Sequence, residues 1–202
     1  MHIYVKFLCI SFFLGGMLFF TDHLHGQSYA DSLEQYRVNR NKEMKDTAHS
    51  PLKKEEILKF KELHFYPANS DYRIYAAFIK NRRKETVTIP TSSGKEKQYY
   101  KIGKAAFELN GVACTLSVFQ PVALKNYIFI PFTDLTNSDE TYGGGRYLEA
   151  SVIGKKKILI DFNYCYNPYC AYTSGYSCPI PPTENFLNTA VKAGEKLLWD
   201  SH

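Results

Sequence analysis

The chain has 202 residues, a length that suits one domain of ordinary size with a small appendage. Hydrophobic residues make up 45% of it and aromatic residues 15%, so a packed core is expected and general disorder is excluded. The formal charge of +5 fits a protein that meets anionic surfaces or ligands. No basic stripe with interleaved aromatic residues is present, so nucleic acid is excluded as the expected partner.

The N-terminus has the pattern of a secretory signal peptide. An apolar run, Phe7 to Phe20, follows Lys6 and is shorter than the roughly 20 residues that a membrane-spanning helix needs. With the small residue Gly26 after a polar stretch, the pattern predicts a signal peptide over residues 1–26; the alternative is an uncleaved anchor. We therefore expect a secreted or periplasmic protein that has no stable membrane span after signal cleavage.

Two helices are predicted before the first strand. Residues 27–49 form the predicted N-terminal helical arm, with Asp31 and Glu34 placed as a capping box. A second helix is expected from Ser50 as N-cap, with Pro51 at the first helical position. It should end near Lys61, because a proline-containing segment follows.

From residue 71 onward the period of the pattern changes to two, which predicts strands. Asn110-Gly111 is typical of the turn of a tight hairpin, and Gly154-Lys155 marks a second hairpin over residues 146–163. Residues 189–199 fit a last strand or a short helix equally well. The predicted fold is mostly β: an antiparallel β-sandwich or partly closed β-barrel of about seven or eight strands, preceded by two helices. Residues 50–202 are expected to form this single β-rich domain.

Two segments, 131–147 and 161–185, are far longer than the usual connection of about 4–6 residues. Polar loops on a β-scaffold often carry binding residues. In the first loop, Gly143, Gly144 and Gly145 could present backbone N–H groups to an anion, with Arg146 as a bidentate donor beside them. The alternative is a glycine bulge where a strand enters the sheet, with Arg146 paired to a carboxylate.

The second loop carries Cys165, Cys170 and Cys178. In an exported protein, a disulfide between Cys170 and Cys178 is the default expectation, although four mature cysteines allow three pairings. The spacing lacks the paired ligands of a zinc site, and His64 is the one plausible base for a catalytic thiolate. Cys114 fits a buried strand position. We predict no metal and no cofactor.

Three stretches of the sequence, "FKELHFYPANSDYRI", "ETYGGGRYLE" and "YSCPIPPTENFL…VKAGEK", resemble the bacterial and archaeal family called domain of unknown function sixteen-eighty-four. The resemblance covers roughly residues 50–196. It implies no activity, but it places the motif residues of the family in the two long loops. They are Glu140, Thr141, Tyr142, Gly143, Gly145, Arg146, Tyr147, Asp161, Asn163, Tyr166, Asn167, Pro168, Cys170, Tyr172, Cys178, Pro179, Glu184 and Asn185. Cys165 and Ser138 depart from the pattern of the family.

The leading hypothesis is therefore an exported β domain that binds a small polar or anionic molecule where the two loops converge. A hydrolytic enzyme that uses Asp161, Glu184 or Cys170 is the alternative, and a purely structural or adhesive protein is a third. The candidate ligand-binding residues are Tyr142, Gly143, Gly144, Gly145, Arg146, Tyr147, Asp161, Asn163, Tyr166, Asn167, Glu184 and Asn185.

Overall fold

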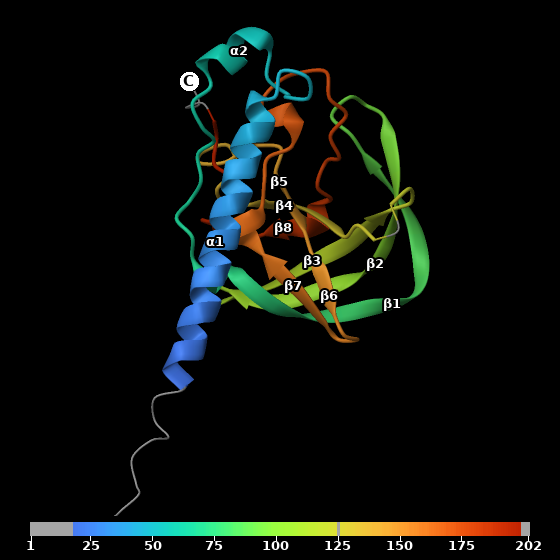
Figure 1. Ribbon diagram of the computed structural model, residues 1–202. Helices are drawn as coiled ribbons and strands as arrows, with labels where there is room; N and C mark the ends of the chain where they lie inside the picture. The colour runs from blue at the N-terminus through green and yellow to red at the C-terminus, as the bar shows by residue number, and fades with distance from the viewer. Residues whose placement is uncertain (1–17, 125, 199–202) are drawn as a thin grey trace, which may run out of the picture.

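The computed structural model of the protein describes residues 18–124 and 126–198 (Figure 1). Its two α-helices are α1 (Leu18–Lys45) and α2 (Lys54–Lys59). The strands are β1 (Arg73–Pro90), β2 (Glu96–Leu109), β3 (Val112–Pro121), β4 (Phe129–Asp134), β5 (Arg146–Glu149), β6 (Ser151–Ile153), β7 (Lys157–Asp161) and β8 (Phe186–Leu187). The mostly β prediction with two helices and about seven or eight strands is confirmed.

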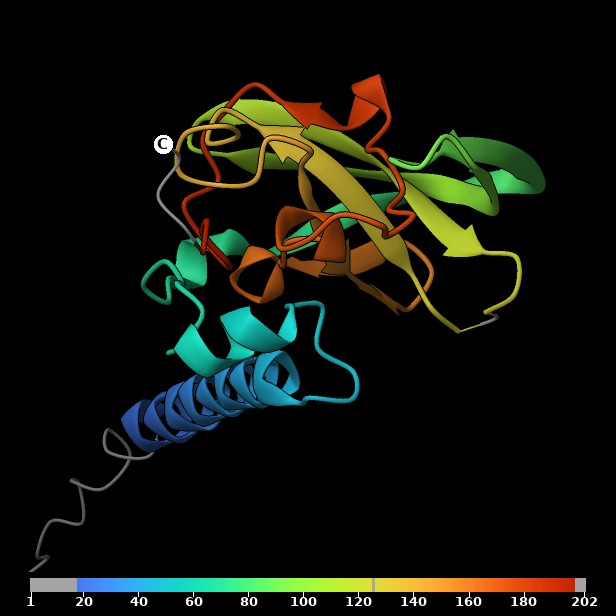
Figure 2. The ribbon, with the colours of Figure 1, turned by 90° about the horizontal axis from the view of Figure 1, so that it is seen from above.

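One sheet contains all of these strands, in the order β5-β4-β3-β2-β1-β7-β6, with β8 beside β4. The strands at the two ends of this order, β5 and β6, are consecutive in the chain and are separated only by Ala150. The sheet therefore curls on itself into a half-barrel (Figures 1 and 2). Neighbouring strands along the order are antiparallel, whereas β8 pairs with β4 in parallel, which the antiparallel prediction missed.

Turn chemistry identified the β2–β3 hairpin correctly. Asn110 and Gly111 adopt positive φ angles of 52° and 76° between β2 and β3, as a type I′ turn requires. Gly154 turns the chain between β6 and β7 with a φ of 63°. This second hairpin is shorter than the predicted 146–163, because residues 146–149 form β5 and pair with β4, so that only β6 and β7 make up the hairpin. The period-two pattern that begins near residue 71 continues through one long strand, β1. A register shift between Lys80 and Glu85 interrupts its pairing with β2, as a β-bulge does.

The main core lies on one face of the sheet. Alternate residues such as Ile130 and Leu148 are fully buried there, and Val191 and Ala193 of the C-terminal segment pack against them. Residues 188–198 form neither the strand ladder nor the short helix expected near the C-terminus, apart from one isolated bridge between Glu195 and Phe65. This segment has no regular secondary structure, and its apolar side chains Val191 and Ala193 pack into the core.

Helix α2 begins three residues later than predicted, at Lys54 rather than Pro51. The reason is packing: Leu52 is buried with Met44 and Phe60, so the chain before α2 turns inward instead of starting a helix. The backbone N–H of Lys53 then donates to the Glu56 carboxylate at 2.8 Å, which caps the shortened helix.

Helix α1 forms a separate layer in Figure 2 and contacts the loop after β7, where the Tyr36 hydroxyl donates to the Tyr164 carbonyl at 3.0 Å. It contains the predicted arm up to Lys45 and extends it in the N-terminal direction to Leu18. Most of the predicted signal peptide, residues 1–17, lies outside the described residues. Among the residues that are described, no helix is both long enough and apolar enough to cross a lipid bilayer.

Candidate functional site

Two neighbouring pockets lie between the sheet, helix α1 and the loop that follows β7. The α1 pocket has a volume of about 820 Å³ and the tyrosine pocket about 690 Å³. Tyr36, Glu149 and Tyr166 line both of them, so the two pockets are halves of one groove. The groove lies on the face away from the main core, because Glu149 alternates with the core residue Leu148 along β5.

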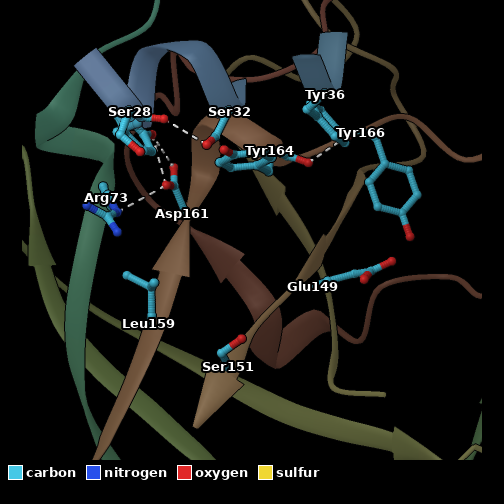
Figure 3. A pocket seen from close by; sticks show the side chains of 11 residues that line it. Ser28, Ser32, Tyr36, Arg73, Glu149, Ser151, Leu159, Asp161, Tyr164 and Tyr166 are labelled. Atoms are coloured by element: carbon cyan, nitrogen blue, oxygen red, sulfur yellow. Dashed lines mark hydrogen bonds and ion pairs between the residues drawn. The ribbon is translucent and has the colours of Figure 1, made fainter. Parts of the chain in front are cut away.

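The α1 pocket is built around Asp161 at the end of β7 (Figure 3). The Tyr29 hydroxyl donates to its carboxylate at 2.9 Å, and the backbone N–H of Asn163 donates at 3.1 Å. The Arg73 guanidinium lies 3.6 Å from the same carboxylate and stacks over the Tyr29 ring at 4.7 Å. Asp161 is thus occupied in joining α1 to β7, and its role as a catalytic acid or base finds no support in these contacts.

The tyrosine pocket has walls of packed aromatic rings. Phe129 stacks on Tyr127 with ring centroids 6.2 Å apart and meets the edge of Tyr147 at 4.9 Å. Tyr147 in turn packs edge-on against Tyr166 at 5.9 Å. Aromatic pairs with these offsets and edge contacts hold one another in place. The pocket is therefore a rigid, mostly apolar surface onto which a flat ring could pack.

A small polar cluster stands where the two pockets meet. The hydroxyl groups of Tyr127 and Tyr166 are hydrogen-bonded at 3.1 Å, and the exposed carboxylate of Glu149 lies close to both. Burial, reinforced by Tyr166 and Glu149, raises the pKa of Tyr127. Burial raises the pKa of Tyr166 to about 12. Both phenols are therefore neutral at physiological pH and can donate as well as accept hydrogen bonds.

These pKa shifts predict that the fold loses stability in alkali. Burial raises the pKa of Tyr166 and of Tyr169 to about 12, from the ordinary 10.0. Only the unfolded chain then ionises near pH 10, so the contribution of these tyrosines is complete below pH 10 and is lost as the pH rises toward 12. Phenolate absorbance of the native protein should thus lag behind that of the denatured protein, and Tyr166→Phe should reduce the loss of stability. Ionisation of all tyrosines near pH 10 without unfolding would contradict this.

A buried carboxylate, Glu195, fastens helix α1 to the walls of the groove. It is fully inaccessible to solvent and accepts a hydrogen bond from Arg40 Nε of α1 at 2.9 Å. Its other oxygen accepts from the backbone N–H of Asn167 at 2.9 Å and from the Tyr172 hydroxyl at 2.7 Å. Arg40 also pairs with Glu43 one turn further along α1. One carboxylate thus joins α1, the second long loop and the C-terminal segment.

The predicted disulfide between Cys170 and Cys178 is confirmed, with an S–S distance of 2.11 Å. It closes the loop that forms one wall of the tyrosine pocket. Beyond it, the chain is held along the end of β1, where the Ile180 N–H donates to the Pro90 carbonyl at 2.9 Å. Because its sulfur is bonded, Cys170 offers no free thiolate, which removes it as the nucleophile of a hydrolytic enzyme.

The remaining thiols described in the structure, Cys114 and Cys165, are free and buried. Burial raises the pKa of Cys165 to about 12, so this thiol stays protonated and unreactive. Within the described residues, no three His, Cys, Asp or Glu side chains gather into a group that could hold a metal ion.

The structure brings some of the predicted site residues to the groove and places others elsewhere. Those that line it are Tyr147, Asp161, Tyr166 and Asn167, together with Cys178. Those that line neither pocket are Tyr142, Gly143, Gly144, Gly145, Arg146, Asn163, Glu184 and Asn185. The two long loops do meet, because Tyr147 and Tyr166 exchange backbone hydrogen bonds of 2.8 and 3.0 Å.

Arg146 lies inside the fold, which corrects its predicted place beside a ligand. It is completely buried and pairs with the equally buried Asp134 at 2.9 Å. Its guanidinium also donates to the carbonyls of Val191 and Ala193 at 2.7 and 2.6 Å. These bonds fix the C-terminal segment against β4 and β5, so Arg146 acts as a structural residue.

The glycine run before Arg146 shapes the entry into β5. Gly145 has a φ of 88°, and a Cβ atom there would stand 2.5 Å from the Phe132 carbonyl oxygen. This geometry favours the strand-entry interpretation over an anion-binding nest. Gly143 and Gly144 are exposed and lie outside both pockets.

The remaining candidates hold the loops together. The Asn163 side chain accepts from the Asn69 N–H at 3.0 Å and donates to the Asn69 carbonyl at 2.8 Å. The Asn185 side chain accepts from the Ser117 N–H and donates to the carbonyls of Ser117 and Pro131, so it connects β3 to β4. Glu184 forms a surface ion pair with Lys101 at 2.8 Å, which lowers the pKa of its carboxyl group. Glu184 lines neither the α1 pocket nor the tyrosine pocket.

Sequence reasoning missed most of the residues that face the groove from α1. Tyr29, Tyr36 and Arg40 recur at helical spacing and share one side of α1. This periodicity was visible in the sequence, but it also fits a helix that simply packs one stripe on a domain. Nothing in the local sequence distinguishes Glu149 and Glu195 from ordinary surface glutamates, so neither could be recognised as a residue of the groove or its supports.

The fold and the groove define a class of protein: a helix-covered, curled β-sheet domain with a groove of small-molecule size. Residues 58–196 match the family described as "Protein of unknown function (DUF1684)", and the chain belongs to this family. It is also similar to an uncharacterized protein of Haloarcula marismortui, known from a solution NMR structure, with 32% sequence identity and a TM-score of 0.69. That similarity covers 85% of this chain and 96% of the archaeal one. No curated protein matches the sequence.

Proposed function

We propose that this protein binds a small polar or anionic molecule in the groove beneath α1. The observation that carries the proposal is the continuity of the two pockets through Tyr36, Glu149 and Tyr166. Each pocket falls in the range of roughly 300–1,000 Å³ that is typical of small-molecule sites. A mostly apolar lining with a few convergent polar groups is also typical of such sites.

The two halves of the groove suggest separate tasks in binding. The aromatic walls of the tyrosine pocket would pack on a ring of the ligand, while Tyr127, Tyr166 and Glu149 would orient its polar groups. Lys97 lines the same pocket and provides a cation for an anionic ligand. The two long loops thus contribute Tyr147 and Tyr166, and Arg146 takes no direct part.

Tyr127→Ala tests this proposal with the anionic aromatic dye 1-anilinonaphthalene-8-sulfonate as the probe. The dye should bind the wild-type protein saturably, and loss of the Tyr127 ring should weaken its binding by about tenfold, since an aromatic contact contributes about 0.5–1.5 kcal/mol beyond its burial. Fluorescence titration measures the dissociation constant, and a thermal melt of each variant confirms that it is folded.

The matched control is Phe186→Ala, which removes an aromatic side chain that is 49% exposed on β8 and lines neither pocket. It should leave the dissociation constant unchanged. If both substitutions weakened the dye equally, or if folded wild-type protein bound no dye, the groove would not be the binding site.

We also propose that the mature chain is exported after cleavage near Gly26. The support is the sequence pattern: Lys6, the apolar run Phe7 to Phe20, and the small residue at the end of a polar stretch. Cleavage there would leave Tyr29 and Tyr36 in the mature chain, so the groove would be complete. N-terminal sequencing of the protein recovered from expressing cells tests this, and an intact N-terminus in every fraction would contradict it.

A further inference from the structure

An exposed apolar surface continues from the α1 pocket across β1, β7 and β6. The strand register places Tyr75 opposite Leu159, and Lys157 lies between Ala77 and Ile153. Because side chains alternate along a strand, Tyr75 and Ile79 point to the same side of β1, away from the core. Their exposed fractions are 56% and 60%, and that of Ile153 is 42%.

Basic side chains surround this apolar surface. Those on the bulged part of β1 are Lys80, Arg82 and Arg83, and those at the β6–β7 turn are Lys155, Lys156 and Lys157; all six are exposed. The turn lies beside β1, since the Phe78 N–H donates to the Lys156 carbonyl at 2.8 Å. Within the described part of the chain, none of the six forms an ion pair. We call the three apolar and six basic residues the β1–β6 patch.

We propose that the β1–β6 patch docks onto an anionic lipid surface. Uncompensated lysines and arginines are attracted to negatively charged headgroups, and apolar side chains among them can enter the boundary between headgroups and acyl chains. A polyanion such as DNA would use the cations but would leave Tyr75, Ile79 and Ile153 without a role. The combination of both kinds of side chain therefore favours lipid.

The placement of the patch agrees with this partner. In Figure 1 the β6–β7 turn and the N-terminal end of α1 both lie at the lower end of the molecule, so the chain enters the described structure on the same side. Leu159 and Ser151 line the α1 pocket and stand in the same row of the sheet as Tyr75. Docking through the patch would thus bring one end of the groove close to the lipid.

Vesicle sedimentation of the full chain tests the proposal. Vesicles of phosphatidylcholine alone are compared with vesicles in which part of the lipid is phosphatidylglycerol. Every variant keeps Phe7 to Phe20, so any binding through this run is the same background throughout. The wild type should prefer the anionic vesicles, and salt should weaken that preference. Lys155→Gln with Lys156→Gln should reduce it by about 25-fold, at about fivefold for each lysine. Ile153→Ser should reduce it by about fivefold.

The control substitutions lie on α2 and just after it, and α2 is at the opposite end of the molecule in Figure 1. Leu58→Ser removes a side chain that is 88% exposed, and Lys59→Gln with Lys61→Gln removes two exposed lysines. Neither should change the preference. Equal binding of the wild type to both vesicles would overturn the proposal. Binding to DNA as tight as to anionic vesicles, combined with no effect of Ile153→Ser, would overturn it in favour of a general polyanion site.

Discussion

Replacing Glu195 with glutamine is expected to lower the free energy of unfolding by about 3–5 kcal/mol. The substitution removes the charge that Arg40 faces in a fully buried position, and it disturbs the bonds from Asn167 and Tyr172. Removing one partner of a buried pair is costly because the other charge stays away from water. Urea unfolding measures the change.

The matched control for this substitution is Glu62→Gln, on an exposed side chain between α2 and β1. It should change stability by no more than about 0.5 kcal/mol. Since Glu195 connects α1 to the groove walls, Glu195→Gln should also weaken dye binding at temperatures where the sheet is still folded. A change of stability no larger than in the control would show that the network does not hold α1.

The second large effect is expected from Arg146→Met. It leaves Asp134 buried without its cation and frees the carbonyls of Val191 and Ala193, which again should cost about 3–5 kcal/mol of stability. The dissociation constant of the dye should not change for the molecules that remain folded, because Arg146 lines neither pocket.

This pair of measurements separates a structural role of Arg146 from a role in ligand binding. Arg82→Met, at an exposed position on β1, is the control and should change stability by no more than about 0.5 kcal/mol. If Arg146→Met kept the wild-type stability and lost dye binding, the sequence-based expectation of an anion donor would be restored and the structural account would fail.

The strands and turns could be predicted because their signals are local. Asn110-Gly111 specifies its hairpin through the backbone conformations that those two residues tolerate, and alternation identifies the buried face of β1. The C-terminal segment could not be predicted in the same way. Val191 and Ala193 are held in place by the core and by Arg146, which lie far away in sequence.

The site was less predictable than the fold because its residue types suit more than one role. An arginine after a glycine run can bind an anion or fill a buried ion pair, and only the position of Asp134 in space decides between them. Tyr166 and Asn167, candidate ligand-binding residues of the second loop, line the tyrosine pocket. The helix residues Tyr29 and Tyr36 required knowledge of the surface on which α1 packs.

Chemical-shift mapping of the ¹⁵N-labelled protein against small polar and anionic ring compounds tests whether the groove beneath α1 is a small-molecule site. Compounds that bind should shift the amide signals of Tyr36, Glu149 and Tyr166, the residues common to both pockets. Shifts centred instead on Gly143 to Arg146, or the absence of any compound that moves the groove signals, would contradict a site in the groove.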